Sequence, residues 1–352
     1  MKTMQRVMAT VGVAGLVLGV AGCHKAGNET VSLTGAGATF PYPLYSKWIS
    51  EYRRVEPTVS INYQSIGSGG GIRQITERTV DFGASDAPMT DEELAGAQAP
   101  LIHVPTTLGA VALVANLPGV STPVRLDGEA LVGIYLGTLT QWNDPSLAAL
   151  NPTITLPAQP IAVVHRSDGS GTTAVFTDYL ARVSTPWRDK VGRGKSIAWP
   201  TGLGAKGNEG VMGLVKTTSF SIGYVELAYA VQSGLPILEI ENQAGRFVAP
   251  TIESISAAAA GTVASMPADF RVSIVDAPGE GAYPIAAFTY LLVYADAPDA
   301  RRAQALATFL HWALGEGQQY AAALHYAPLP APVAMRVEAA VARLGKGGTA
   351  VD

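Results

Sequence analysis

The chain has 352 residues, of which 48% are apolar and 15% are charged. This apolar share suffices for a buried core and excludes a disordered chain, and the length predicts about two domains. The formal net charge of −4 excludes a strongly basic protein of the kind that binds nucleic acid through its overall charge.

The first 22 residues have the pattern of an export signal. Two basic residues open it, and residues 7–21 form an uncharged apolar run that is short for a membrane-spanning helix. The run ends in Val-Ala-Gly-Cys at residues 20–23, which resembles a bacterial lipoprotein cleavage box. Cys23 is the single cysteine, which excludes an intramolecular disulfide, so we expect it to carry a diacylglycerol anchor and to begin a polar tether over residues 23–30. The alternative is a plain secretory signal with a chance cysteine.

Beyond the tether, strand-like and helix-like segments alternate along the chain. Strands are predicted at residues 31–33, 59–63, 80–84, 102–115, 161–165, 222–225 and 288–294. Helices are predicted from residue 41 to about 52 and at residues 72–79, 91–98, 131–135, 173–181, 226–231 and 254–260, with a helix pair over residues 299–323 that is broken at 315–317. Pro41 suits a first helical turn, and Thr90 is a candidate N-cap. Such alternation predicts an α/β protein with a mostly parallel sheet in each of two lobes.

Three turns share one pattern, in which a strand is followed by a turn of small and hydroxyl-bearing residues and then by a helix. These turns are Thr39-Phe40, Ser68-Gly69-Gly70-Gly71 and Ser170-Gly171-Thr172. The N-terminus of a helix has unpaired N–H groups and a partial positive charge, so each turn could bind an anion. One such turn is equally explained as a stabilising cap, but three in one chain favour a shared anion site.

One arginine and two aspartates refine this hypothesis. Arg166 offers a fork of N–H donors suited to a tetrahedral oxyanion, and Asp168 is placed to hold the guanidinium. Asp86 would repel a fully ionised ligand, but it could accept a hydrogen bond from an oxyanion that carries a proton. Phosphate carries one at neutral pH and sulfate does not, so Asp86 predicts discrimination on the order of 10⁴. The alternatives are a surface ion pair for Arg166 and a turn or cap role for Asp86.

Several stretches together resemble the periplasmic phosphate-binding protein of high-affinity phosphate importers. They match in order and spacing, and they are residues 34–41, 63–68, 81–88, 166–172, 206–211 and 222–226. The resemblance runs from about residue 33 to about residue 330. It implies that phosphate is bound by Thr39, Phe40, Ser68, Arg166, Ser170, Gly171 and Thr172, with Asp86 as the proton acceptor and Asp168 as the brace of the arginine. Some family members have a second serine where this chain has Gly69, which is expected to make the turn more flexible, and the lipoprotein box is not universal in the family.

The resemblance implies a periplasmic-binding-protein fold of type II, with two α/β lobes joined by two or three hinge strands. Lobe 1 is expected to contain residues 31–105 plus 285–352, and lobe 2 the inserted residues 106–284. Phosphate would bridge the lobes, and the closed form would be recognised by the permease subunits of an ABC importer. We expect a lipid-anchored protein of the periplasm or cell envelope, with no enzymatic activity, no cofactor, no metal and no nucleic-acid partner.

Three other functions have some support in the sequence, but each is disfavoured. A nucleotide enzyme is suggested only by Gly169–Ala174, which fits G-x-G-x-x-A but has no strand ending in an acid about 20 residues later. A phosphatase or serine hydrolase is disfavoured because neither Ser68 nor Ser170 lies in G-x-S-x-G, and His165 is expected to be structural. A receptor of the same fold for sulfate, molybdate or tungstate is disfavoured by Asp86, because these ions carry no proton at neutral pH.

Overall fold

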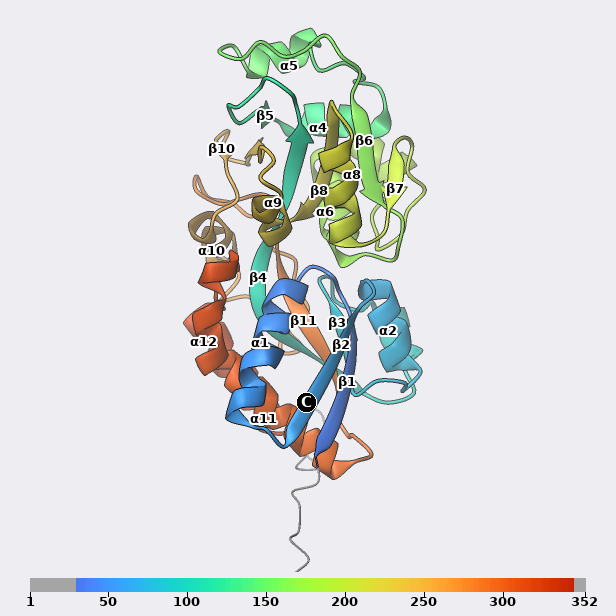
Figure 1. Ribbon diagram of the computed structural model, residues 1–352, viewed down its shortest axis with the longest axis vertical. Coiled ribbons are helices and arrows are strands. Elements are labelled where there is room, and N and C mark those ends of the chain that lie inside the picture. Colours follow the sequence, from blue (N-terminus) through green and yellow to red (C-terminus); the bar gives the residue numbers. More distant parts are fainter. Residues whose placement is uncertain (1–29, 345–352) are drawn as a thin grey trace, which may run out of the picture.

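The computed structural model describes residues 30–344, so the predicted signal sequence and Cys23 lie outside the described residues. Two α/β lobes lie one above the other along the long axis of the molecule, and one long strand, β4, runs through both of them (Figure 1). The expected two-lobed fold is confirmed.

The first lobe is built on three parallel strands in the order β2-β1-β3. The strands are β1 (Val31–Gly37), β2 (Val59–Ser65) and β3 (Phe82–Ser85), and the helices that follow them are α1 (Tyr42–Val55), α2 (Ser68–Thr76) and α3 (Asp91–Ala95). The chain later returns to this lobe with α11 (Ala300–Leu314), two short 3₁₀ segments (Glu316–Tyr320 and Ala322–Leu324) and α12 (Ala331–Val341) (Figure 1).

The second lobe contains a parallel set of strands and a small separate sheet. The parallel strands are β6 (Ala162–Arg166), β7 (Leu203–Ala205) and β8 (Ser221–Glu226), and the three-stranded sheet consists of β5 (Arg125–Leu126), β9 (Glu239–Glu241) and β10 (Phe247–Val248). The helices of this part of the chain are α4 (Gly128–Leu136), α5 (Pro145–Leu150), α6 (Gly171–Val183), α7 (Thr185–Lys190), α8 (Gly207–Thr217), α9 (Leu227–Ser233) and α10 (Ile252–Ala260).

Two strands join the lobes into one eight-stranded sheet. Residues 101–110 of β4 (Leu101–Asn116) pair antiparallel with β11 (Ala286–Tyr294), and residues 111–116 pair antiparallel with β8. The strand order across the whole sheet is therefore β2-β1-β3-β11-β4-β8-β6-β7. The sequence predicted parallel strands within each lobe correctly, but it did not predict these antiparallel pairs, because β4 and β11 look like any other buried apolar strand in the sequence.

Three fully buried tryptophans show how the core accommodates polar groups. The indole N–H of Trp48 donates to the carbonyl oxygen of Gly317 at 2.7 Å, and Trp142 and Trp187 donate to the carbonyl oxygens of Phe220 and Gly192 at 2.8 Å. Each ring therefore buries its apolar surface without leaving its donor unpaired.

Helices α2, α4, α6 and α10 begin two to four residues earlier than the sequence predicted. Helix α2 starts at Ser68 and α6 at Gly171, with Ser170 as the N-cap of α6. The glycines that the sequence predicted as a preceding turn are therefore helical residues of the first turns. The Thr90 cap of α3 is confirmed as a capping box with Glu93.

Of the helix pair predicted over residues 299–323, the first helix is confirmed and the second is wrong. Helix α11 ends at Leu314, and the following residues form the two 3₁₀ segments instead of a second α-helix. The carbonyl of Gly317 accepts the Trp48 hydrogen bond described above, so packing against α1 fixes this segment. Helices α5, α7, α8 and α12 and the short strands β5, β7, β9 and β10 were not predicted. Among residues 30–344, no helix combines the length and apolar character needed to cross a membrane.

We expect Gly71→Ala to destabilise the fold by about 2 kcal/mol through overpacking. A Cβ at residue 71 would lie 2.5 Å from the Cα of Gly37 and 2.6 Å from the carbonyl oxygen of Ala36, so α2 would have to move off the sheet. The matched control is Gly213→Ala in α8, where a Cβ meets nothing within 4 Å. It should be neutral or stabilise by about 0.5–1 kcal/mol. Urea unfolding of both variants measures the difference, and equal midpoints would contradict the packing argument.

Candidate functional site

The candidate residues lie at or just after the carboxyl ends of parallel strands, at the edge of each lobe that faces the other lobe. Thr39 and Phe40 follow β1, Ser68 follows β2, Asp86 follows β3, and Arg166 ends β6. In open α/β sheets this carboxyl edge is the usual position of a ligand site. The nine predicted ligand and supporting residues lie together in one group. Six of them have polar side chains that are at most 3% exposed: Thr39, Ser68, Asp86, Arg166, Ser170 and Thr172.

The two lobes touch at this site through backbone groups. The N–H of Gly171 donates to Ser68 Oγ at 3.0 Å, and the N–H of Gly69 donates to the carbonyl oxygen of Gly169 at 2.8 Å. A Cβ on Gly171 would lie 2.5 Å from both Ser68 Oγ and Asp86 Oδ2. Gly69 was expected to loosen its turn, but it lies in the first turn of α2 and faces Gly169, so its role here is close approach between the lobes.

Asp168 holds the guanidinium group of Arg166 with both carboxylate oxygens. Nε donates to Oδ1 at 2.7 Å and Nη2 donates to Oδ2 at 2.6 Å, which leaves Nη1 directed at Thr172 Oγ1, 3.4 Å away. The N–H of Gly207 also donates to Asp168 at 3.1 Å. Burial alone would raise the pKa of Asp168, but the hydrogen bonds and the positive charge of Arg166 hold it below its usual value. The side of the guanidinium that carries Nη1 is therefore turned toward the start of α6.

Asp86 is a buried carboxyl group within reach of both lobes. Its Oδ1 accepts a hydrogen bond from Thr289 Oγ1 at 2.9 Å, and its Oδ2 lies 3.4 Å from Ser68 Oγ. Burial raises the pKa of Asp86 to about 7, although the Thr289 hydroxyl and the charge of Arg166 act in the opposite direction. Near neutral pH this group can therefore either accept a hydrogen bond as a carboxylate or donate one as an acid.

Asn208, which the sequence reasoning did not select, connects the two lobes at this point. Its Nδ2 donates to Thr39 Oγ1 at 2.7 Å and to Thr172 Oγ1 at 3.2 Å, while its Oδ1 accepts from the N–H of Glu226 at 2.9 Å. It is fully buried in the first turn of α8. The stretch 206–211 had been noted only for its family resemblance, and no signal in it distinguished the asparagine.

Thr289 was also missed, although a signal was present. The strand Ala286–Tyr294 is fully buried, and Thr289 carries its only aliphatic hydroxyl group. A buried hydroxyl needs a hydrogen-bond partner. That partner is Asp86. The Thr39-Phe40 turn is held in a similar way, because Tyr229 donates to the carbonyl of Thr39 at 2.7 Å and Tyr326 donates to the carbonyl of Phe40 at 2.6 Å.

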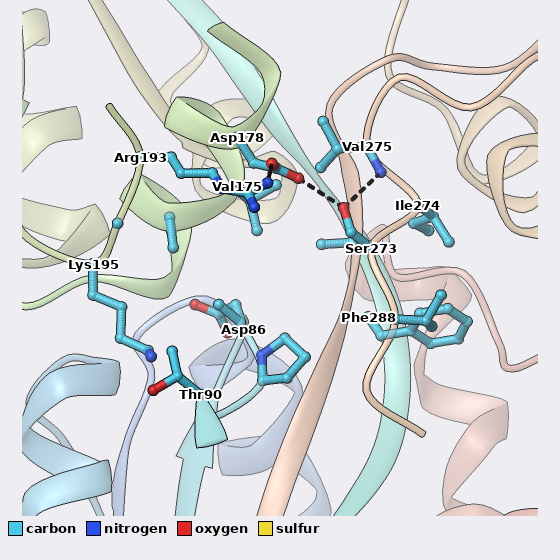
Figure 2. Close-up of a pocket in the computed structure, with 16 residues that line it drawn as sticks. Asp86, Thr90, Val175, Asp178, Arg193, Lys195, Ser273, Ile274, Val275 and Phe288 are labelled. Atoms are coloured by element: carbon cyan, nitrogen blue, oxygen red, sulfur yellow. Dashed lines mark hydrogen bonds and ion pairs between the residues drawn. The ribbon is translucent and has the colours of Figure 1, made fainter. Parts of the chain in front are cut away.

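A cavity of about 330 Å³ adjoins the site on one side of Asp86. It is lined by the segment after Asp86, by one face of α6, by β11 next to Thr289, and by Arg193, Lys195 and Ser273 from neighbouring loops. Figure 2 shows Asp86 between the Lys195 side and the Ser273 side of this cavity. The carboxyl group of Asp86 therefore lies at the boundary between the polar cluster and this space.

Within the part of the chain that the structure describes, no group of three or more histidine, cysteine, aspartate or glutamate side chains is arranged to hold a metal ion. The polar groups of the site are hydroxyls, backbone N–H groups, the guanidinium of Arg166 with its partner Asp168, the amide of Asn208 and the buried carboxyl group of Asp86. Such a set suits the recognition of a tetrahedral anion.

Comparison with known proteins places the chain in a family. Residues 24–316 match the model of the PBP superfamily domain, so the chain is a two-lobed binding protein of that superfamily. It is 47% identical over 310 residues to the phosphate-binding protein PstS of Haemophilus influenzae, covering 87% of this chain and 91% of that protein. It is also 39% identical over 337 residues to the phosphate-binding protein PstS of Methanocaldococcus jannaschii, covering 86% of each. Within the superfamily, the chain belongs to the PstS family of phosphate-binding proteins.

Solved structures show the same fold at lower identity. A high-affinity periplasmic phosphate-binding protein bound with phosphate aligns with a TM-score of 0.71 and 23% identity, covering 88% of this chain and 93% of that chain. A phosphate-binding protein from Stenotrophomonas maltophilia aligns with a TM-score of 0.67 and 19% identity, covering 88% and 94%.

Proposed function

We propose that this protein binds inorganic phosphate between its two lobes and delivers it to an ABC-type phosphate importer. Membership of the PstS family supports the ligand and the transport role. The observation that supports the site most directly is the meeting of Arg166, the first turn of α6 and the buried carboxyl group of Asp86 at the point where the lobes touch.

The hydroxyl groups of the site are oriented as donors. Ser68 Oγ accepts from the N–H of Gly171, and Ser170 Oγ accepts from the N–H of Thr173. Thr39 Oγ1 and Thr172 Oγ1 both accept from Asn208. An oxygen that accepts an N–H from the protein keeps its own hydrogen for a further partner. The hydroxyls of Thr39, Ser170 and Thr172 can therefore donate to phosphate oxygens, whereas the hydroxyl of Ser68 donates to Asp86 Oδ2 at 3.4 Å and would exchange this partner for phosphate.

The remaining ligand groups follow from the same geometry. Phe40 and Gly171 would contribute backbone N–H groups at the starts of α1 and α6, where the helix N-termini favour an anion. The N–H of Gly171 donates to Ser68 Oγ in this structure, so it would share or exchange that partner when phosphate binds. Arg166 would contribute Nη1, because Asp168 occupies its other side. Asp86 would accept the hydrogen that phosphate carries. In this proposal Asn208 orients hydroxyls and Thr289 orients Asp86, without either being required to touch the ligand.

A hydrolytic function is not supported by these contacts. The hydroxyls of Ser68 and Ser170 interact with backbone N–H groups instead of a histidine base. His165 lies beside Arg166, but its Nδ1 contacts the carbonyl oxygen of Arg166 at 3.0 Å and its ring stacks on Trp199 with centroids 4.8 Å apart. We therefore propose that phosphate is bound and released unchanged.

We propose that residues 31–105 plus 285–352 form one moving lobe and residues 106–284 the other. Phosphate contacts both lobes in this arrangement, so it would favour the closed state by differential contact, and the closed state would be the form recognised by the permease subunits. The change of partner strand between residues 110 and 111 of β4 supports a hinge close to the proposed boundary. Residues near 271 lie against the first lobe, through Arg271 bound to Asp91 and to the carbonyl of Met89.

We expect isothermal titration of the purified protein to give heat with phosphate and none with sulfate at pH 8. Arg166→Ala should weaken phosphate binding by about 100-fold or more, because it removes a buried charge-assisted donor and leaves Asp168 unpaired. Arg125→Ala is the matched control, since it removes the same charge from an ion pair with Glu239 that is far more exposed. Sulfate binding as tightly as phosphate, or equal effects of the two variants, would disprove the proposed recognition.

The discrimination against sulfate should depend on pH. Below a pKa of about 7, Asp86 is protonated and can donate to an oxyanion that has no hydrogen of its own. Above that pKa it is a carboxylate, which repels sulfate but accepts the hydrogen of phosphate. We therefore expect sulfate binding to become measurable as the pH falls from 8 to 5.5. Asp86→Asn, which offers an amide donor at every pH, should bind sulfate at pH 8 with little pH dependence. Sulfate affinity that rises with pH would contradict this role.

We also propose export and lipid anchoring through Cys23. The only support for this part of the proposal is the sequence pattern at residues 20–23. In a bacterial host, Cys23→Ser should move the protein from the membrane fraction to the soluble fraction, and the wild-type protein should incorporate labelled fatty acid. A soluble, unlabelled wild-type protein would show that the apolar run is a plain secretory signal, while leaving the phosphate site untouched.

A further inference from the structure

An ion pair spans the two lobes at the rim of the cavity beside Asp86. Lys195 Nζ donates to Glu93 Oε1 at 3.0 Å and to Oε2 at 2.8 Å. Glu93 belongs to α3, which follows the Asp86 segment of the first lobe, whereas Lys195 lies in the loop after α7 in the second lobe. The side chains are 31% and 14% exposed, so this pair is better shielded from solvent than most ion pairs of the surface.

Each partner is fixed by a second contact. Glu93 Oε2 accepts from the N–H of Thr90 at 2.9 Å in the capping box of α3, so the carboxylate is already oriented before the lysine arrives. The carbonyl oxygen of Lys195 accepts from the N–H of Ser170 at 2.9 Å, and Ser170 is the N-cap of α6. The lysine is thus bonded by its backbone to the anion-binding turn and by its side chain to the opposite lobe.

The position of the pair links it to ligand exchange. Lys195 and Thr90 line the same cavity that borders Asp86, and Figure 2 shows the Lys195 side chain extending toward Thr90 beside Asp86. The lobes cannot separate along this side without breaking the bonds from Lys195 to Glu93. An interaction that exists only when the lobes are closed stabilises the closed state and so raises the affinity for any ligand that is bound there.

We propose that Lys195 and Glu93 form a clasp across the cleft that slows the release of bound phosphate. The inference rests on the proposed function, because it assigns a role in phosphate retention to two residues that do not touch the ligand. Lys195 and Glu93 are positioning residues, and their contribution lies in the opening step.

The test is stopped-flow measurement of phosphate association and dissociation with Lys195→Met and Glu93→Gln. Each variant should raise the Kd for phosphate about threefold to tenfold, mainly through faster dissociation. Glutamine preserves the capping box of α3, so the second variant removes the charge while keeping the helix start. The double variant should be no weaker than either single variant, because both changes remove the same interaction.

Lys47→Met is the matched control. It removes the same charge and breaks an ion pair with Glu51 inside one helix of the first lobe. It should leave the dissociation rate unchanged, and urea unfolding of ligand-free Lys195→Met should match that of Lys47→Met. A loss of stability confined to Lys195→Met would assign Lys195 a general structural role and overturn the clasp.

The sign of the Glu93→Gln effect separates the clasp from simple electrostatic attraction. If Lys195 acted only by attracting the anion, removing the negative charge of Glu93 would speed association and tighten binding. The clasp predicts faster dissociation and weaker binding for the same change. Unchanged dissociation in both variants, with phosphate bound normally by the wild-type protein, would overturn the clasp alone, whereas a wild-type protein that does not bind phosphate would overturn the proposed function.

Discussion

The hydrogen bond from the N–H of Gly171 to Ser68 Oγ joins the first turn of α6 to the first turn of α2, and most of the site is arranged around this contact. It requires a glycine on the α6 side, because a Cβ there would collide with Ser68 and Asp86. It also requires that both helices start at the edge of the cleft, since only unpaired N–H groups of a first turn can face the opposite lobe. The parallel strands of the two lobes accordingly have their carboxyl ends toward each other within the one eight-stranded sheet.

Around this contact, several charged and polar side chains are paired with one another. Arg166 is held by Asp168, Asp86 by Thr289, and two threonine hydroxyls by Asn208. Buried polar groups of this kind are costly when they are unpaired, so under the proposed function an anion that lacks a matching hydrogen would be rejected by the same groups that stabilise a correct one. Specificity in this proposal comes from the arrangement of pairs that are already present and depends little on the net charge of −4, which is unfavourable to anions.

Much of this arrangement could be predicted from local sequence. The strands and the three hydroxyl-bearing turns each have a short-range pattern, although α2 and α6 begin earlier than that pattern predicted. The bracing of Arg166 by Asp168 needs only two residues of separation. What could not be predicted depends on contacts between distant segments. Asn208 acts on Thr39, which lies 169 residues away, and Thr289 acts on Asp86, which lies 203 residues away. The antiparallel pairing of β4 with both β11 and β8 is likewise a property of the assembled sheet.

The continuity of β4 constrains how the lobes can move. Because one strand carries ladder hydrogen bonds to β11 along residues 101–110 and to β8 along residues 111–116, neither lobe is attached by a loose linker. In the proposed movement of the lobes, this hydrogen-bonded sheet would have to twist. Side chains on a strand alternate between faces, so losing a single residue from this strand would reverse the inward and outward faces of one half relative to the other. The alignment of the two half-sites is thus encoded in the length of one strand as much as in the ligand residues themselves.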